Sequence, residues 1–223
     1  STWALFLTKP SDLGYPDIGY ELPELRVHEE VVSVDNSTAG TDRDGQVKMF
    51  REAALGLADA AKERRDNMQE KIVRVVEIIN RPENKDAHFL LWHDLENERK
   101  ALCDAIPGCK AVYGSQDDDE ADKVIADFKD GRLKYLAAKP EMLGEGLNFQ
   151  YHCHKAIMFI DYRFNDKFQA IARIYRFMQQ HPVDLYLVYA ESEGEIYKSF
   201  MQKWAQHREM VAKMTDIVRE NGL

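Results

Sequence analysis

Two arginines, Arg173 and Arg176, stand three residues apart in the segment 169–179, which reads QAIARIYRFMQ. The segment has the apolar spacing of a helix and follows an apolar run typical of a buried strand, so we expect both side chains on one helical face. Guanidinium groups stay charged at physiological pH and match phosphate oxygens with paired donors. Such a pair at the mouth of an α/β sheet suits the charge that builds on a phosphoryl group during transfer. The alternative is a pair of surface salt-bridge residues.

A glycine-bearing loop lies upstream of the arginines. Residues 143–149 read LGEGLNF and come directly after the strand-like residues 133–138. Gly144 and Gly146 allow a ligand to approach the backbone closely, and the amide of Asn148 can hydrogen-bond a ribose or a neighbouring segment. The alternative is a plain turn between two strands.

The order of these two segments resembles motifs V and VI of superfamily 2 helicases, specifically the Swi/Snf-type branch. Further matches are residues 88–92 (motif IV), the turn Tyr113-Gly114-Ser115, Phe128 at a helix end, and Asp161 with Asn165 as a D-x-x-x-N step. The resemblance covers roughly residues 22–200. It implies an α/β fold in which a RecA-like parallel sheet is flanked by helices, as in the C-terminal lobe of a two-lobed motor (the helicase C-terminal domain).

The resemblance also implies roles in ATP hydrolysis. Arg176 is similar to the arginine finger that reaches across a cleft to the γ-phosphate, and Arg173 to the catalytic companion that braces that phosphate or the facing lobe. The implied ATP-binding positions are Gly144, Gly146, Asn148 and Gln169. Gln169 and the neighbouring Gln179 have a simpler alternative role, capping or bridging within the helix.

The implied nucleic-acid positions are Lys139, Gly114 and Ser115. Lys139 stands where the family has a DNA-contacting hydroxyl and would touch a backbone phosphate instead. The chain departs from the family pattern at three places: Met178 replaces the usual glycine of motif VI, Lys139-Pro140 replaces the Ser-Thr of motif V, and Ala121 replaces an arginine. These departures bear more on nucleic-acid contact than on the two arginines.

A phosphate-binding Walker A loop is absent from the sequence. Residues 40–45, GTDRDG, reproduce its glycine spacing, but Gln46 and Val47 follow where lysine and a hydroxyl are required. We interpret this stretch as a solvated turn. No acidic D-E-x-H box follows, so we expect ATP and Mg²⁺ to bind only with the N-terminal helicase lobe of the same polypeptide. The isolated chain is predicted to be inactive and to hold no bound metal.

Charge and cysteine content agree with a globular protein. The formal net charge is -9, but residues 1–45 carry nine acidic and three basic side chains, so the rest is nearly neutral. DNA, duplex or single-stranded, is the expected partner, bound weakly in isolation. Three scattered cysteines form no disulfide framework, and His152-Cys153-His154 is interpreted as a loop rather than a metal site. Without a signal peptide or long apolar span, we expect a cytoplasmic or nucleoid protein that is neither secreted nor membrane-bound.

The pattern along the chain predicts four parts: an extended linker or wrapping segment with a strand (1–45), a helical region packed on the lobe (46–80), the RecA-like lobe (81–200) and a terminal helix (201–223). Strands are predicted at 26–34, 88–92, 110–113, 133–138, 156–160 and 184–189, and helices at 96–106, 120–129, 166–177 and from 194 onward. Alternating strands and helices are typical of a parallel sheet.

Taken together, these features predict the second motor lobe of an ATP-dependent nucleic-acid helicase or translocase. One alternative is a motor-derived module that binds nucleic acid or protein without its own ATPase. A weaker alternative is an α/β transferase that uses the arginines on a nucleotide-sugar diphosphate.

Overall fold

The computed structural model describes residues 11, 15–16, 22–33, 67–143 and 147–220. The GTDRDG turn, most of the segment 1–45, residues 46–66, and both Gly144 and Gly146 lie outside the described residues.

Six strands form one sheet in the order β1-β6-β5-β2-β4-β3, and every neighbouring pair is parallel. The strands are β1 (Leu25–Val32), β2 (His88–Trp92), β3 (Lys110–Val112), β4 (Tyr135–Ala138), β5 (Cys153–Phe159) and β6 (Val183–Ala190). This confirms the predicted α/β fold with a RecA-like parallel sheet. All carboxyl ends of the strands therefore meet at one edge of the sheet.

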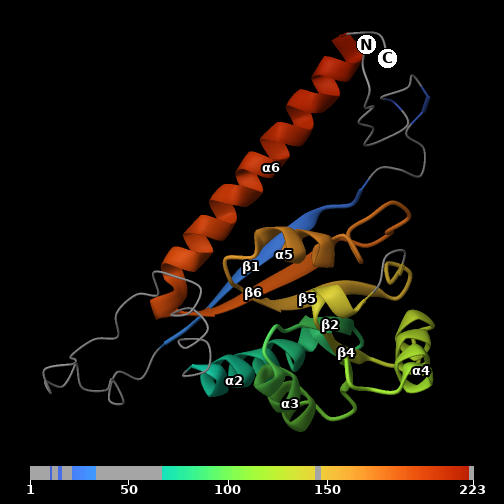
Figure 1. Ribbon diagram of the computed structural model, residues 1–223, viewed down its shortest axis with the longest axis vertical. Helices are drawn as coiled ribbons and strands as arrows, with labels where there is room; N and C mark the ends of the chain where they lie inside the picture. The colour runs from blue at the N-terminus through green and yellow to red at the C-terminus, as the bar shows by residue number, and fades with distance from the viewer. Residues whose placement is uncertain (1–10, 12–14, 17–21, 34–66, 144–146, 221–223) are drawn as a thin grey trace, which may run out of the picture.

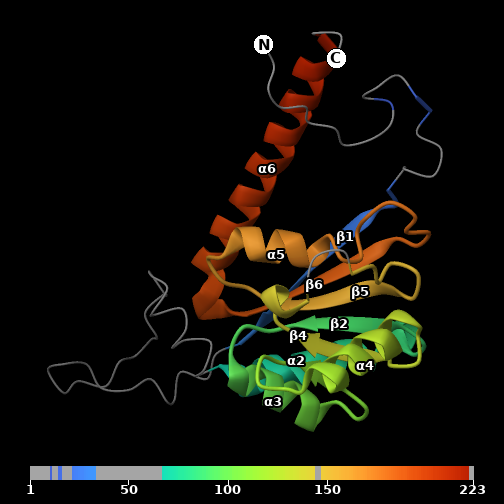
Figure 2. The same ribbon diagram turned by 45° about the vertical axis from the view of Figure 1, so that its right-hand side comes forward.

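Helices cover both faces of the sheet (Figures 1 and 2). They are α2 (Met68–Ile79), α3 (Glu96–Ala105), α4 (Asp118–Lys129), α5 (Phe164–Ile171) and α6 (Gly194–Glu220), with short 3-10 turns at Pro82–Asn84, Pro140–Met142 and Glu191–Glu193. Apolar residues of α2 and α3 join the core on one face, and those of α4, α5 and α6 join the core on the other. The far end of α6 projects well beyond the sheet.

The side chains of β2 show why the core has two halves. Leu90 and Trp92 point into one half, and Phe89 and Leu91 into the other, as the two-residue period of a strand requires. All eight residues of β6 are buried, and all but Asp184 are apolar or aromatic, as expected for a strand covered on both sides.

The start of α4 and the end of α5 differ in how well the sequence predicts them. The carboxylate of Asp117 accepts from the amides of Asp119 and Glu120 at 3.0 and 3.3 Å, so Asp117 caps the start of α4. The helix predicted over 166–177 ends at Ile171. The prediction that Arg173 and Arg176 share a helical face is therefore wrong.

A buried ion pair joins α2 to the turn before α6. The Lys71 Nζ donates to both carboxylate oxygens of Glu193 at 2.9 and 3.1 Å, and the two side chains are 2% and 1% exposed. Glu193 also accepts from the amide of Ala190 at 2.7 Å. The pair holds α2 against the end of β6.

Candidate functional site

The arginines lie in a turn that tertiary contacts hold. After α5, the amide of Tyr175 donates to the backbone carbonyl of Ile171 at 2.9 Å, and the amide of Gln179 donates to the backbone carbonyl of Arg176 at 3.2 Å. The buried Gln179 side chain donates to the carbonyls of Ile174 and Cys153, both at 3.1 Å. Cys153 is the first residue of β5, so the turn is anchored toward the amino edge of the sheet.

Arg173 connects this turn to the segment that contains the glycine loop. Its Nη2 donates to the carbonyl of Leu143 at 3.1 Å, and its own carbonyl accepts from the amide of Phe149 at 3.3 Å. Leu143 and Phe149 flank residues 144–146 on either side. The half-buried Arg173 therefore contacts both ends of the segment whose middle lies outside the described residues.

Arg176 is differently placed. Its guanidinium carbon lies 5.3 Å from the ring centroid of Phe177, within the range of a cation–π contact, and its side chain is only partly buried. Within the part of the chain that the structure describes, Arg176 has no ion pair, and its Nε has no hydrogen-bond partner. A buried donor without a partner favours the arrival of an anion that accepts from it.

Of the four predicted ATP-binding positions, Asn148 and Gln169 lie among the described residues, and they are placed differently from each other. The Oδ1 atom of Asn148 is buried and has no hydrogen-bond partner among the described residues. Gln169 is exposed on α5. Gln179 makes only internal bonds: besides its two carbonyl contacts, its Oε1 accepts from the amide of His181 at 3.0 Å. Gln179 is thus a structural tie between the turn and β5.

Met178 has a positive φ of 66°. This is the left-handed region, which costs an ordinary residue about 1–2 kcal/mol and costs glycine almost nothing. The family resemblance places glycine at this position, and the backbone here has the conformation that favours glycine. The hydroxyl of Tyr151 contacts the Met178 sulfur at 3.6 Å across the turn.

The positions predicted to contact nucleic acid lie at the carboxyl edge of the sheet. Lys139 directly follows β4, and the exposed Gly114 and Ser115 follow β3. A side chain added at Gly114 would lie 3.9 Å from Met142, so the two turns are adjacent. The structure thus brings Lys139, Gly114 and Ser115 to one edge. The turn with Arg173 and Arg176 is tied to Cys153 at the amino edge by Gln179, but Arg173 itself reaches Leu143, four residues beyond Lys139.

A buried charge cluster at the carboxyl edge was not predicted. Asp94, which follows β2, pairs with Lys167 of α5 and, at 2.9 Å, with Arg163. Arg163 also pairs with Asp161 at 2.9 Å. Asp94 and Lys167 are 2% and 0% exposed. The sequence signals were an acidic residue after each of two strands, Asp94 after β2 and Asp161 after β5, and the basic residues Arg163 and Lys167 near the start of α5.

Next to this cluster, His93 is fully buried, and neither ring nitrogen has a hydrogen-bond partner within the described residues. Burial lowers the pKa of His93 to about 4, and the nearby Lys139 adds to that decrease. The imidazole is therefore neutral at physiological pH.

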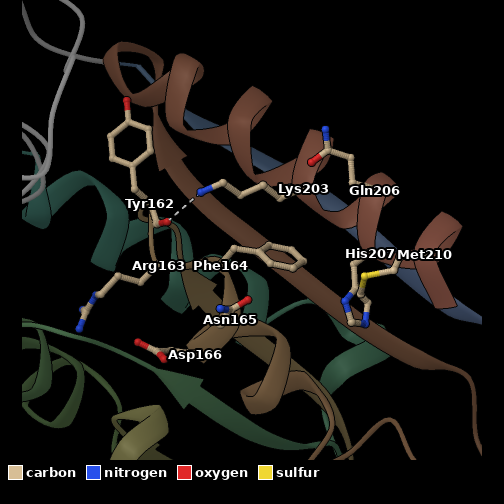
Figure 3. Close-up of a pocket in the computed structure, with 9 residues that line it drawn as sticks. All are labelled: Tyr162, Arg163, Phe164, Asn165, Asp166, Lys203, Gln206, His207 and Met210. Atoms are coloured by element: carbon tan, nitrogen blue, oxygen red, sulfur yellow. Dashed lines mark hydrogen bonds between the residues drawn. The ribbon is translucent and has the colours of Figure 1, made fainter. Parts of the chain in front are cut away.

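A surface pocket of 530 Å³ lies between the start of α5 and α6 (Figure 3). Its lining includes Asn165, which resembles the last residue of the family's D-x-x-x-N step, and Lys203, whose Nζ donates to the carbonyl of Tyr162 at 3.3 Å. None of the predicted catalytic, ATP-binding or nucleic-acid-binding residues lines this pocket.

Among the described residues, no three His, Cys, Asp or Glu side chains are grouped in a way that could hold a metal ion. The ring centroids of His154 and His181 are 5.1 Å apart. Cys153 lies between His152 and His154 in sequence, but it is buried in the core, where its thiol donates to backbone carbonyls. In the same part of the chain, no helix combines the length and apolar character needed to cross a membrane.

Comparison with known proteins identifies the fold. No protein-family model matches the chain, and no curated protein sequence matches it significantly. The C-terminal part of the Fun30 ATPase domain matches in structure with a TM-score of 0.58 and 11% identity, over 90% of this chain and 98% of that one.

Dbp5 of S. cerevisiae gives two further structural matches. Its C-terminal domain, bound to Gle1 and IP6, matches with a TM-score of 0.50 and 13% identity, over 67% of this chain and 94% of that one. A longer Dbp5 chain matches at 0.51 and 12%, over 87% of this chain and 46% of that one. The chain therefore has the fold of a RecA-like helicase C-terminal lobe. At these identities the likeness establishes the fold alone.

Proposed function

We propose that this chain is the second motor lobe of an ATP-dependent nucleic-acid helicase or translocase, supplying the arginine finger and part of the DNA-binding surface. The observation that carries the proposal is the state of Arg176, a partly exposed guanidinium that has no ion pair within the described residues. The fold shared with the C-terminal part of the Fun30 ATPase domain supports it.

In this proposal, ATP and Mg²⁺ are bound by the first lobe, since this sequence lacks a Walker A loop. Closure of the lobes brings Arg176 against the γ-phosphate, where its planar fork neutralises the charge that develops in the transition state. Arg173, which contacts the carbonyl of Leu143, is a positioning residue for the glycine loop. Lys139, Gly114 and Ser115 contact the nucleic-acid backbone at the carboxyl edge.

The test is Arg176→Ala in the two-lobed parent. ATP affinity should stay near wild type while single-turnover hydrolysis falls on the order of a thousandfold, the low end for an arginine finger. Arg176→Lys should rescue poorly because an ammonium keeps the charge but loses the planar fork. Arg132→Ala is the matched control, since Arg132 is an exposed arginine paired with Asp127 and Asp130.

Thermal melting of the same variants separates a catalytic role from a structural one. Arg176→Ala should melt close to wild type, because the change breaks no ion pair of the described residues. Normal hydrolysis by the alanine variant, or a melting temperature many degrees lower, would show that Arg176 is structural.

A second candidate function is a protein-binding module with no turnover of its own. A groove of 480 Å³ between β1, α5 and α6 supports it, lined by apolar residues that include Leu25, Phe168 and Trp204. In addition, the C-terminal domain of Dbp5, which has this fold, is bound to Gle1. ATP hydrolysis by the parent that nucleic acid stimulates distinguishes the candidates, because a motor lobe predicts it and a binding module without turnover does not.

A further inference from the structure

Two of the three cysteines lie side by side at one end of α3. The sulfur atoms of Cys103 and Cys109 are 3.8 Å apart, close enough for one thiol to donate to the other. Cys103 is in the last turn of α3 and is partly exposed, whereas Cys109 directly precedes β3 and is buried. A disulfide has a shorter sulfur–sulfur distance, about 2.0 Å, so its formation requires the two sulfur atoms to move closer together.

The local backbone holds the two thiols in this arrangement. The chain reverses between α3 and β3 in the turn Ile106-Pro107-Gly108-Cys109, where the amide of Cys109 donates to the carbonyl of Ile106 at 3.0 Å. Gly108 has a φ of +80°, as the third residue of a type II turn requires, and proline is favoured just before it. The buried side chain of Ile106 anchors the turn in the core. The proximity of the thiols is therefore built into the fold.

The environment of the two thiols differs in a way that assigns their roles. The hydrogen bond from Cys109 lowers the pKa of Cys103 to about 7 despite partial burial, and the charge of Arg99 contributes to the decrease. The same hydrogen bond, together with burial, raises the pKa of Cys109. Cys103 thus supplies an accessible thiolate near neutral pH, and Cys109 stays protonated beside it.

We propose that Cys103 and Cys109 are a redox-active thiol pair that is oxidised reversibly to a disulfide by a low-molecular-weight disulfide of the glutathione class. The Cys103 thiolate attacks one sulfur of the oxidant, the oxidant's S–S bond breaks, and one glutathione leaves as a thiolate that takes up a proton. Cys109 then loses its proton and attacks the Cys103 sulfur, which releases the second glutathione. Two protein thiols are oxidised, and one disulfide is reduced to two thiols.

Cys153 provides an internal comparison. It is 1% exposed in the core, where burial raises its pKa to about 12, and its sulfur contacts the backbone carbonyls of His88 and Lys155. A thiol without access or thiolate character should not react with the oxidant while the protein is folded.

The experiment treats the folded full chain with oxidised glutathione at neutral pH and follows it by intact mass and peptide mapping. The wild type should lose two hydrogens, carry no glutathione and show a 103–109 link that a dithiol reductant removes. Cys109→Ser should stop at a stable glutathione adduct on Cys103. Cys103→Ser should remain unmodified, because the remaining thiols are buried. Cys153→Ser should form the link as the wild type does.

Three results would overturn the proposal: a wild-type chain that stays fully reduced, one that retains glutathione on Cys103 without closing the link, or modification of Cys103→Ser at Cys109 at the wild-type rate. Thermal melting confirms that each variant is folded before treatment. Cys103→Ala and Cys109→Ala repeat the test without a hydroxyl, so a folding defect of either serine variant does not leave the question open.

Discussion

Mild acidification should destabilise this protein, and replacing His93 with phenylalanine should make that loss of stability much smaller. The imidazole is fully buried at the end of β2, and neither nitrogen has a hydrogen-bond partner within the described residues. Burial lowers its pKa from 6.5 to about 4. Phenylalanine keeps an aromatic ring in this space but cannot take up a proton.

The sign and size of the effect follow from proton linkage. Above pH 6.5 the imidazole is neutral in both the folded and the unfolded chain, so it contributes no pH dependence. As the pH falls, the unfolded chain binds a proton and the folded chain does not, so the free energy of unfolding decreases until the folded imidazole titrates near pH 4. Across the whole interval between the two pKa values, the free energy of unfolding should fall by about 3 kcal/mol. About 2 kcal/mol of this decrease should occur between about pH 7 and about pH 5.

The assay is urea unfolding of the wild type, His93→Phe and the control His152→Gln at those two pH values. His152 lies on an exposed turn before β5, so its replacement should leave the wild-type pH dependence in place. His154, whose pKa burial also lowers, is present in all three proteins and cancels from the comparison. Equal losses of stability in the wild type and His93→Phe would refute the reasoning.

Three further predictions test the buried ion pair, the turn at Met178 and the proposed nucleic-acid contact at the carboxyl edge of the sheet. Lys71→Met should lower the free energy of unfolding by about 3–5 kcal/mol, because it leaves the Glu193 carboxylate buried without its cation, and Lys71→Met with Glu193→Gln should recover most of that loss in urea unfolding. Met178→Gly should raise the free energy of unfolding by up to about 1 kcal/mol, since relief of the left-handed strain exceeds the added entropy of the unfolded chain, and a decrease of that size would contradict the strain. Lys139→Glu in the two-lobed parent should weaken DNA binding and reduce its log–log salt slope by about one; an unchanged slope would remove Lys139 from the contact surface.

The sheet could be predicted from sequence because its strands are short apolar runs bounded by polar turns. The predicted strand at 88–92 coincides with β2, and the predicted 184–189 lies within β6. In β6 every residue but Asp184 is apolar or aromatic because helices cover both faces, so the run is visible in the sequence. The capping of α4 by Asp117 is similarly local.

The end of α5 could not be predicted from the same patterns. The helical spacing of apolar residues continues to Phe177, yet the helix ends at Ile171. Beyond that point, the carbonyl of Arg173 accepts from Phe149 and the side chain of Gln179 binds Cys153, so groups distant in sequence replace the helical bonds. Met178 stands in for glycine in the left-handed conformation, so the usual residue signal for a turn is absent.

Buried polar groups were the other part that sequence did not reveal. The pairing of Asp94 with Lys167 joins residues separated by 73 positions, and the pairing of Lys71 with Glu193 joins residues separated by 122. Each side chain alone is an ordinary charged residue, and only the topology of the sheet brings the partners together. The proximity of Cys103 and Cys109 is hidden for a different reason, because it depends on the intervening Pro107-Gly108 turn.

The contacts of Arg173 give the two proposed surfaces a physical connection. The arginine binds the carbonyl of Leu143, which lies four residues beyond Lys139 at the carboxyl edge, and its own carbonyl holds Phe149. Arg176 belongs to the same turn as Arg173. A displacement of that turn would therefore act on Leu143 and Phe149 through these two hydrogen bonds. Within the described residues, Arg173 is thus a direct link between the turn that carries Arg176 and Leu143, so a test of coupling between the two proposed surfaces should begin with Arg173.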